Sequence, residues 1–116
     1  MNNIVLIGRL TKNPDVRTSG DTTVAKYTLA VDRIKGEEAD FIPCTVFNKG
    51  AEFASKYFEK GMRIAVQGRL QTGSYTNAEG SKIYTMEVIV TTQEFADSKK
   101  KGDEKQEPSF EDVIES

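Results

Sequence analysis

The sequence has no histidine and no tryptophan, a single cysteine and only three prolines, and it contains no long apolar run. Without histidine, the chain has no Cys/His set that could hold zinc and no plausible nucleophile and base pair. General acid–base and covalent catalysis therefore lack their usual residues, and we expect neither an enzyme nor a cofactor. Acidic residues at Asp32, Glu37, Glu38 and Asp40 could bind Mg²⁺ in principle, but clustered carboxylates at a turn are more often only solvated.

Other function classes are disfavoured by the same kind of scarcity. No apolar run approaches the ~18 residues that span a bilayer, and residues 1–9 lack the charge and cleavage pattern of a signal peptide. The glycines do not form a dinucleotide or phosphate loop, because Gly68 and Gly73 are too far apart and no Gly-Lys-Ser/Thr occurs. The lone Cys44 lies in an apolar stretch that favours a buried, inert thiol. We expect a cytoplasmic protein without a membrane segment.

Charge divides the 116 residues into two regions. Residues 1–96 hold 12 Lys and Arg against 11 Asp and Glu, whereas residues 97–116 hold 4 against 7, so the overall net charge of −2 combines a balanced and an acidic part. The composition of residues 97–116 offers almost nothing to bury. We predict one folded domain over residues 1–96 and a disordered acidic C-terminal tail over residues 97–116, so a polyanion site would have to be a local stripe of cations.

Apolar residues between Ile4 and Phe95 recur mostly with a period of two, which indicates strands with two unlike faces. The exception is residues 51–60, where apolar residues recur at helical spacing, with Asn48 as the expected cap and Gly61 as the expected stop. The recurring residues are Ala51, Ala54, Tyr57 and Phe58. Turn residues separate the strands at positions 13–15, 19–21, 35–37 and 77–80. The order of three strands, one helix and two strands predicts an all-β protein with one helix, a five-stranded Greek-key barrel of the OB-fold type, although other small barrels also fit.

Residues 40–49 carry the most informative pattern. In an extended strand, Phe41, Pro43, Thr45 and Phe47 point to one side, while the residues between them are aliphatic and point to the other. Two rings with a lysine just beyond, Lys49, would form a platform on which nucleobases stack beside a phosphate contact. The alternative is that both faces are buried against the helix, a neighbouring strand or another subunit.

Tyr75 favours binding over burial, because residues 72–77 read as a polar loop where a core needs no aromatic ring. Cations are interleaved with the rings, and Arg9, Lys49 and Arg69 rank first because they adjoin the aromatic strand or glycines at which the backbone can approach a ligand closely. The predicted stacking residues are Phe41, Phe47 and Tyr75, and the predicted backbone contacts are Arg9, Arg33, Lys35, Lys49, Arg69 and Lys82.

Many short stretches occur in the order and spacing found in bacterial and phage single-stranded DNA-binding proteins, and the chain resembles that family across roughly residues 1–96. The matching stretches are Met1-Asn2-Asn3, Leu6-Ile7-Gly8-Arg9-Leu10-Thr11, Asn13-Pro14-Asp15-Val16-Arg17, Leu29-Ala30-Val31-Asp32-Arg33, Asp40-Phe41-Ile42, Val46-Phe47-Asn48-Lys49, Tyr57-Phe58-Glu59-Lys60-Gly61, Gly68-Arg69-Leu70-Gln71-Thr72, residues 74–80 and Tyr84-Thr85-Met86-Glu87-Val88.

The resemblance implies an OB-fold homotetramer that coats single-stranded DNA without sequence preference in DNA replication, recombination and repair, in the cytoplasm and associated with the nucleoid. It also implies that Phe41, Phe47 and Tyr75 occupy stacking positions, some of which hold tryptophan in relatives. The chain departs from the family after Arg33, where the turn is short and Ile34 replaces a frequent aromatic residue. Phenylalanine and tyrosine offer smaller stacking faces than tryptophan, so affinity per site would be lower.

The tail also departs from the family, which usually ends in an acidic run closed by Pro-Phe that docks replication and repair proteins. Here the chain ends without a terminal phenylalanine, and a docking peptide would have to use Phe110, Asp112, Val113 and Ile114. Two other functions stay open from the residues alone. One is an OB-fold protein whose aromatic face binds another protein, and the other is a small hydrolase with a metal site.

Overall fold

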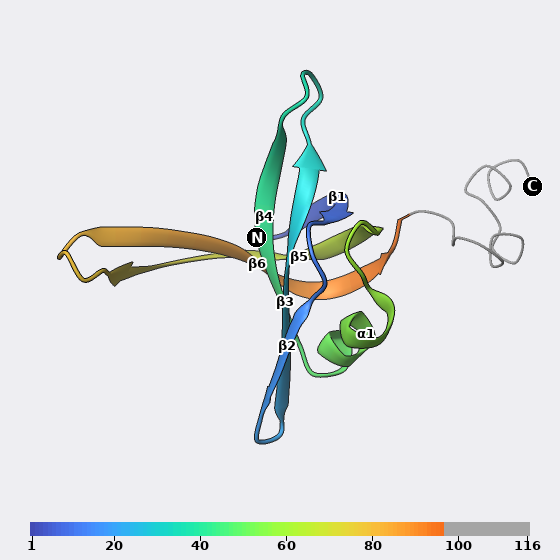
Figure 1. Cartoon of the computed structure of the whole chain (residues 1–116), viewed down its shortest axis with the longest axis horizontal. Coiled ribbons are helices and arrows are strands. Elements are labelled where there is room, and N and C mark those ends of the chain that lie inside the picture. Colours follow the sequence, from blue (N-terminus) through green and yellow to red (C-terminus); the bar gives the residue numbers. More distant parts are fainter. Residues whose placement is uncertain (97–116) are drawn as a thin grey trace, which may run out of the picture.

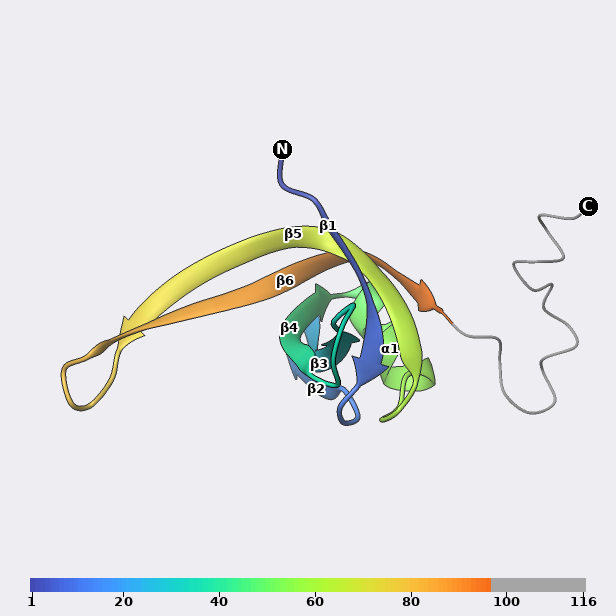
Figure 2. The same ribbon diagram turned by 90° about the horizontal axis from the view of Figure 1, so that it is seen from above.

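The computed structural model describes residues 1–96, and it places one helix after four strands and before two more. The strands are β1 (Ile4–Leu10), β2 (Asp15–Ser19), β3 (Thr22–Asp32), β4 (Ala39–Phe47), β5 (Arg63–Thr76) and β6 (Lys82–Phe95), and the helix is α1 (Lys49–Tyr57). Five strands close a ring in the order β1, β5, β6, β4, β3, because β1 pairs with β3 as well as with β5 (Figure 2). The predicted all-β class with one helix and a five-stranded barrel is confirmed.

A short additional strand, β2, lies outside this ring. It pairs with the first half of β3, from Asp15 opposite Lys26 to Ser19 opposite Thr22. The turn between them contains Gly20, whose φ of 60° lies in the left-handed region that glycine adopts without strain. The sequence predicted the flanking turns but not this strand, because five residues with one apolar side chain give no clear alternation.

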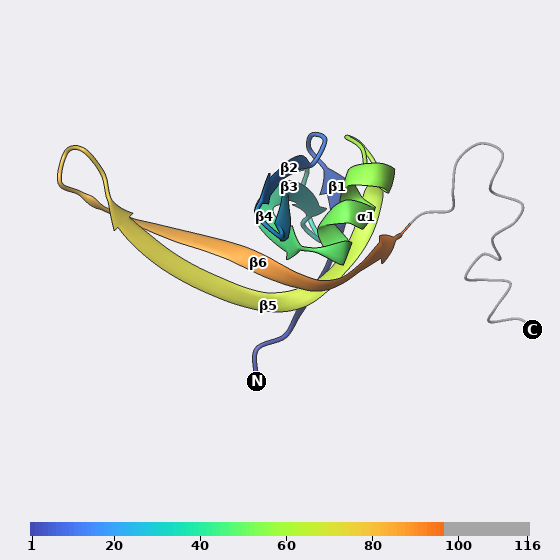
Figure 3. The same ribbon diagram turned by 90° about the horizontal axis from the view of Figure 1, so that it is seen from below.

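Alternating side chains of the ring strands fill the barrel. Tyr27 and Leu29 of β3, Ile64 and Val66 of β5 and the valines of β6 are buried, as their period of two predicts. Helix α1 covers the barrel interior at one side and contributes its buried alanines (Figure 3). Gln93 fixes the helix to the sheet, since its side chain accepts a hydrogen bond from the Tyr27 hydroxyl at 2.7 Å and donates one to the Gly50 carbonyl at 2.7 Å.

The helix differs from its prediction at both ends. It runs from Lys49 to Tyr57 instead of over residues 51–60, and the Asn48 side chain makes no capping hydrogen bond. Phe58 leaves the helix in an extended conformation, which places its buried ring against Tyr27 with 6.0 Å between the ring centroids. Gly61 has a φ of 90°, but it lies in the turn before β5 and does not end the helix. No helix within residues 1–96 is long and apolar enough to cross a membrane.

The glycines next to Arg9 and Arg69 serve the barrel itself. A Cβ added at Gly8 would lie 2.6 Å from the Ala30 carbonyl oxygen, and one added at Gly68 would lie 2.1 Å from that of Ile89. Both glycines therefore allow neighbouring strands to approach, and the strand register shifts at Gly68. That they also open the backbone to a ligand stays a prediction.

Beyond the barrel, β5 and β6 continue as a two-stranded arm, defined here as residues 71–87, that projects away from the ring (Figure 1). Residues 71–76 of this arm are exposed and pair in register up to Thr76 opposite Lys82. The predicted loop at residues 72–77 is thus mostly strand, and the turn comes after it. There the Asn77 side-chain oxygen accepts hydrogen bonds from the backbone of Glu79 and Ser81, each at 2.9 Å.

Candidate nucleic-acid interface

The outward side chains of β3 and β4 form one continuous surface, which we call the platform. Directly opposed residues of antiparallel strands point to the same side of a sheet. The outward pairs are Val24 with Phe47, Lys26 with Thr45, Thr28 with Pro43, and Ala30 with Phe41. The two rings therefore stand on the outside of the barrel with small or polar side chains between them.

Both rings of the platform are open to solvent. The exposed fractions are 65% for Phe41 and 43% for Phe47, whereas the residue midway between Phe47 and Pro43, Thr45, is buried. Thr45 is covered because β6 runs beside β4 at this point, and its hydroxyl donates a hydrogen bond to the Glu87 carboxylate. The platform thus carries two exposed rings, with one carboxylate held at its β6 side.

Tyr75 and Arg69 continue this outer surface along β5. Arg69 of β5 is paired with Ile89 of β6, and Ile89 is paired with Thr45 of the platform. Tyr75 lies six residues after Arg69 and therefore points to the same side of β5. The Tyr75 ring is 57% exposed. It lies on the arm, some 20 Å along the strand from Arg69 at roughly 3.3 Å per residue, so it is well separated from the platform.

Arg9 lies in the same cross-strand row as one platform ring. It pairs with Ala30 of β3, which is itself opposite Phe41. Its guanidinium donates a hydrogen bond to the Gly61 carbonyl oxygen at 3.2 Å and is otherwise exposed. Register therefore brings together Arg9 and Phe41, which are 32 positions apart in the sequence.

Arg33 is held by carboxylates of its own hairpin. Its guanidinium lies 2.8 Å from an Asp40 oxygen and 3.1 Å from a Glu38 oxygen. Hydrogen bonding to the Arg33 guanidinium lowers the pKa of Asp40, and the same bond raises the pKa of Arg33. The two charges therefore satisfy one another at neutral pH, which leaves less positive charge for a phosphate.

The remaining predicted cations occupy three different places. Lys35 lies in the exposed turn between β3 and β4, and Lys49 is the first residue of α1, two positions after Phe47. Lys82 is opposite Thr76, so it lies on the other side of the arm from Tyr75. Its ammonium is 5.7 Å from the centroid of the Tyr84 ring. The structure therefore does not bring Lys82 together with Tyr75.

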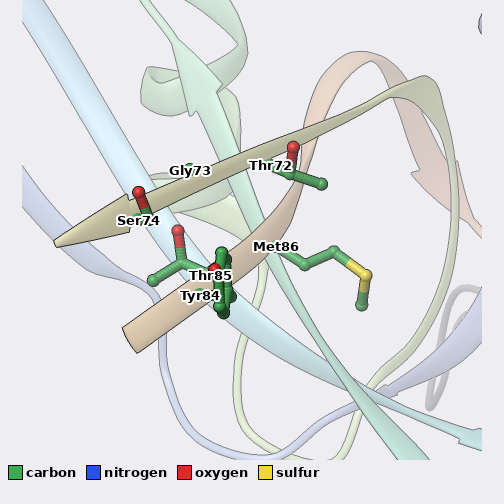
Figure 4. A pocket seen from close by; sticks show the side chains of 6 residues that line it. All are labelled: Thr72, Gly73, Ser74, Tyr84, Thr85 and Met86. Carbon is green, nitrogen blue, oxygen red and sulfur yellow. The ribbon is translucent and has the colours of Figure 1, made fainter. Parts of the chain in front are cut away.

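Sequence reasoning missed an exposed surface around Tyr84. Tyr84 and Met86 share their side of β6 with Val88 and Val90, and alternation alone groups all four as one buried face. The valines are buried, but Tyr84 and Met86 are exposed because the arm has left the barrel. They line an open hollow of about 590 Å³ together with Thr72, Gly73, Ser74 and Thr85 (Figure 4).

Two further observations concern predictions outside the platform. The proposed docking residues Phe110, Asp112, Val113 and Ile114 lie outside the described residues. Within residues 1–96, no group of three or more His, Cys, Asp or Glu side chains is arranged to hold a metal ion.

Comparison with known proteins gives a consistent result. The model of the single-strand binding protein family matches residues 1–96. The chain is 48% identical over 101 residues to a single-stranded DNA-binding protein of Clostridium perfringens, a match that covers 84% of this chain and 67% of that protein. It is 47% identical over 104 residues to single-stranded DNA-binding protein B of Bacillus subtilis (84% and 92%), and 44% identical over 113 residues to single-stranded DNA-binding protein 1 of Staphylococcus aureus (92% and 72%).

Proposed function

Because the chain belongs to the single-strand binding protein family, we propose that it coats exposed single-stranded DNA without sequence preference. The family match and the names of the relatives support DNA as the ligand, and the platform supplies a surface for it. The protein acts by binding and does no chemistry on the strand. By holding the strand unpaired and covered, it would protect DNA and remove hairpins during replication, recombination and repair.

One observation carries this proposal: Phe41 and Phe47 stand exposed on the same outer face of the barrel. An exposed ring gains by burying its apolar face, and each nucleobase offers a flat π-surface of the right shape. Stacking of this kind contributes about 1–3 kcal/mol per base and tolerates any sequence. Tyr75 would add a third stacking position on the arm.

Cations near the rings would hold the phosphates. Arg9 lies in the row of Phe41, Lys49 follows Phe47, and Arg69 lies on the outer face of β5. The affinity for a single strand falls as salt rises, and each phosphate that the protein neutralises makes the slope of log affinity against log salt steeper by about 0.7. With few cations on a domain of nearly balanced charge, we expect a moderate salt dependence.

The test is a fluorescence titration of oligo-dT with the full chain and with Phe41→Ala and Phe47→Ala variants. Each substitution should weaken binding by roughly 5- to 150-fold, which corresponds to the loss of one stacked base. The matched control is Tyr57→Ala, since Tyr57 is also an exposed ring but lies on α1, away from the platform. Equal affinity of the unchanged protein for duplex and single strand would contradict the proposal, as would equal effects of Phe47→Ala and Tyr57→Ala.

We further propose that the protein works as a homotetramer. The outward side chains of β1 include Val5 and Ile7, both exposed, and these pair with Gln67 and Ala65 of β5. An exposed apolar strip on a sheet face is typical of a surface that another subunit covers. Assembly would place several platforms along one strand of DNA. Residues 97–116, which lie outside the described residues, would dock partner proteins, and the protein would associate with the nucleoid in the cytoplasm.

A further inference from the structure

Lys26 occupies the centre of the platform, although the sequence pattern alone did not single it out. It is exposed on the outer side of β3, opposite Thr45 of β4 and opposite Asp15 of β2. Along β4, its row lies about 7 Å from the row of Phe47 and about 13 Å from that of Phe41, at roughly 3.3 Å per residue. Lys26 therefore lies beside the line that joins the two rings.

A hollow of about 430 Å³ opens beside Lys26. Asp15 and Arg17 of β2 and Val24 and Lys26 of β3 line it. Val24 of β3 is paired with Arg17 of β2 on one side and with Phe47 of β4 on the other. Val24 alone therefore lies between the hollow and the Phe47 ring. The outer surface therefore continues from β4 over β3 onto β2 without a break.

The charges around the hollow favour an anion. Arg17 makes only a long ion pair with Asp15, at 3.5 Å, and both side chains are largely exposed, so water screens that pair. Within residues 1–96, no carboxylate lies within ion-pairing distance of the Lys26 ammonium. The hollow thus presents two cations against one carboxylate, in contrast to Arg33, which two carboxylates neutralise.

We propose that this hollow is a phosphate-binding subsite for single-stranded DNA, in which Lys26 and Arg17 contact the backbone next to the nucleotide whose base stacks on Phe47. A base that lies flat on a ring leaves its sugar and phosphate at the edge of that ring, and on the β2 side this edge meets the hollow. The inference rests on the proposed function and extends the path of the DNA onto β2.

The experiment measures oligo-dT affinity at several salt concentrations for the full chain and for Lys26→Gln, Arg17→Gln and the double variant. Each single substitution should lower the steepness of the salt dependence by about 0.7 log units, and the double variant by about twice as much. Lys56→Gln is the matched control, because Lys56 is an exposed lysine on α1 and its loss changes the net charge equally. Phe47→Ala should weaken binding without changing the slope.

Two additional variants test whether the charge inside the hollow determines the effect on binding. Lys26→Arg should retain the slope of the unchanged protein, and Asp15→Asn should tighten binding, because it removes the carboxylate from the hollow. The inference is overturned if the unchanged protein binds oligo-dT while Lys26→Gln and Lys56→Gln give the same salt dependence. Absence of oligo-dT binding by the unchanged protein would instead reject the proposed function itself, so the two failures are distinguishable. Circular dichroism of each variant confirms that these exposed substitutions leave the fold intact.

Discussion

Cys44 shows what the barrel interior does to a single side chain. It is 1% exposed, next to Val88 of β6 in the sheet, and desolvation by burial raises the pKa of its thiol to about 12. The thiolate is the reactive form of cysteine. The apolar neighbours of Cys44 in the sequence already predicted an inert, buried thiol, and the structure supplies the physical reason.

Because the thiol stays protonated while the barrel is folded, Cys44 should react very slowly with a thiol reagent at pH 8 and quickly in denaturant. A pH effect follows from the same shift. The pKa of the Cys44 thiol is ordinarily near 9.0 and is about 12 in the folded chain. At pH values between these two, the unfolded chain has lost the thiol proton, whereas the folded chain keeps it. The free energy of unfolding should therefore fall as pH rises above about 9 and be unaffected by this group below it.

Urea unfolding at pH 7 and pH 10 measures this effect, and Cys44→Ala should reduce the difference between the two. A part of the difference should remain, because burial also raises the pKa of Tyr27. An identical pH dependence in the Cys44→Ala variant would contradict the prediction.

At the scale of elements, charges at the turn end of the β3–β4 hairpin hold its two strands together. Arg33 donates to Asp40 and Glu38, and its backbone amide donates to the Glu38 carbonyl at 3.3 Å. The lowered pKa of Asp40 means that its carboxylate stays ionised at all pH values above its usual 3.8, so the pair is intact at neutral pH and is lost only in acid.

Asp40→Asn should release the Arg33 guanidinium from its closest carboxylate. If Arg33 then reaches phosphate, the salt dependence of oligo-dT binding should steepen by up to about 0.7 log units, and affinity at low salt should rise. Arg33→Gln tests the opposite change and should alter binding little, since this guanidinium is already neutralised. A large loss of affinity in Arg33→Gln would show that the ion pair opens on binding and would contradict this view.

The arm marks a limit of prediction from alternation. The period of two along β6 correctly predicts one face that includes Tyr84, Met86, Val88 and Val90, but it carries no signal for where the barrel ends. Burial changes between Met86 and Val88. The first half of β6 is paired with β5 alone, whereas the second half also lies beside β4 and belongs to the barrel. That boundary depends on the lengths of other strands, which no local pattern contains.

The C-terminal end of helix α1 was also predicted incorrectly. Of the four residues predicted to share the apolar face, Ala51, Ala54 and Phe58 are buried, but Tyr57 is 51% exposed. The helix ends before Phe58, whose ring enters the core from an extended residue. The platform was easier to predict, because Phe41 and Phe47 are on one strand. Lys26 alternates with the buried Tyr27, so its outward direction was readable, but its place between the rings depends on the register with β4.

For the whole molecule, closure of the barrel determines which apolar surface stays exposed for contact with another subunit. One edge of β1 is paired with β5 from Ile4 to Arg9, whereas the other edge is paired with β3 only at Arg9 and Leu10, and the inward residues of β1 fill the barrel. Val5 and Ile7 point outward, and they are 61% and 46% exposed. A second subunit would therefore either cover this strip face to face or extend the sheet along residues 4–8 of β1, which β3 does not pair.

Ile7→Glu should therefore disrupt the proposed homotetramer. A charge placed in a subunit interface must lose its hydration, which costs several kcal/mol without a partner, while on an exposed strand of a monomer it costs little. Light scattering should give a mass of about four times the 12.9 kDa chain for the unchanged protein and a lower multiple for the variant. Ile34→Glu is the control, because Ile34 is a fully exposed isoleucine in the β3–β4 turn.

Binding by the Ile7→Glu variant should depend on the length of the DNA. On an oligonucleotide that covers one platform, affinity should match that of the unchanged protein, since Phe41 and Phe47 are untouched. On a long strand it should be weaker, because linked platforms raise one another's effective concentration and separate chains do not. If Ile7→Glu and Ile34→Glu show the same mass, the outer face of β1 is not the subunit interface, and the tetramer would have to be built on another surface.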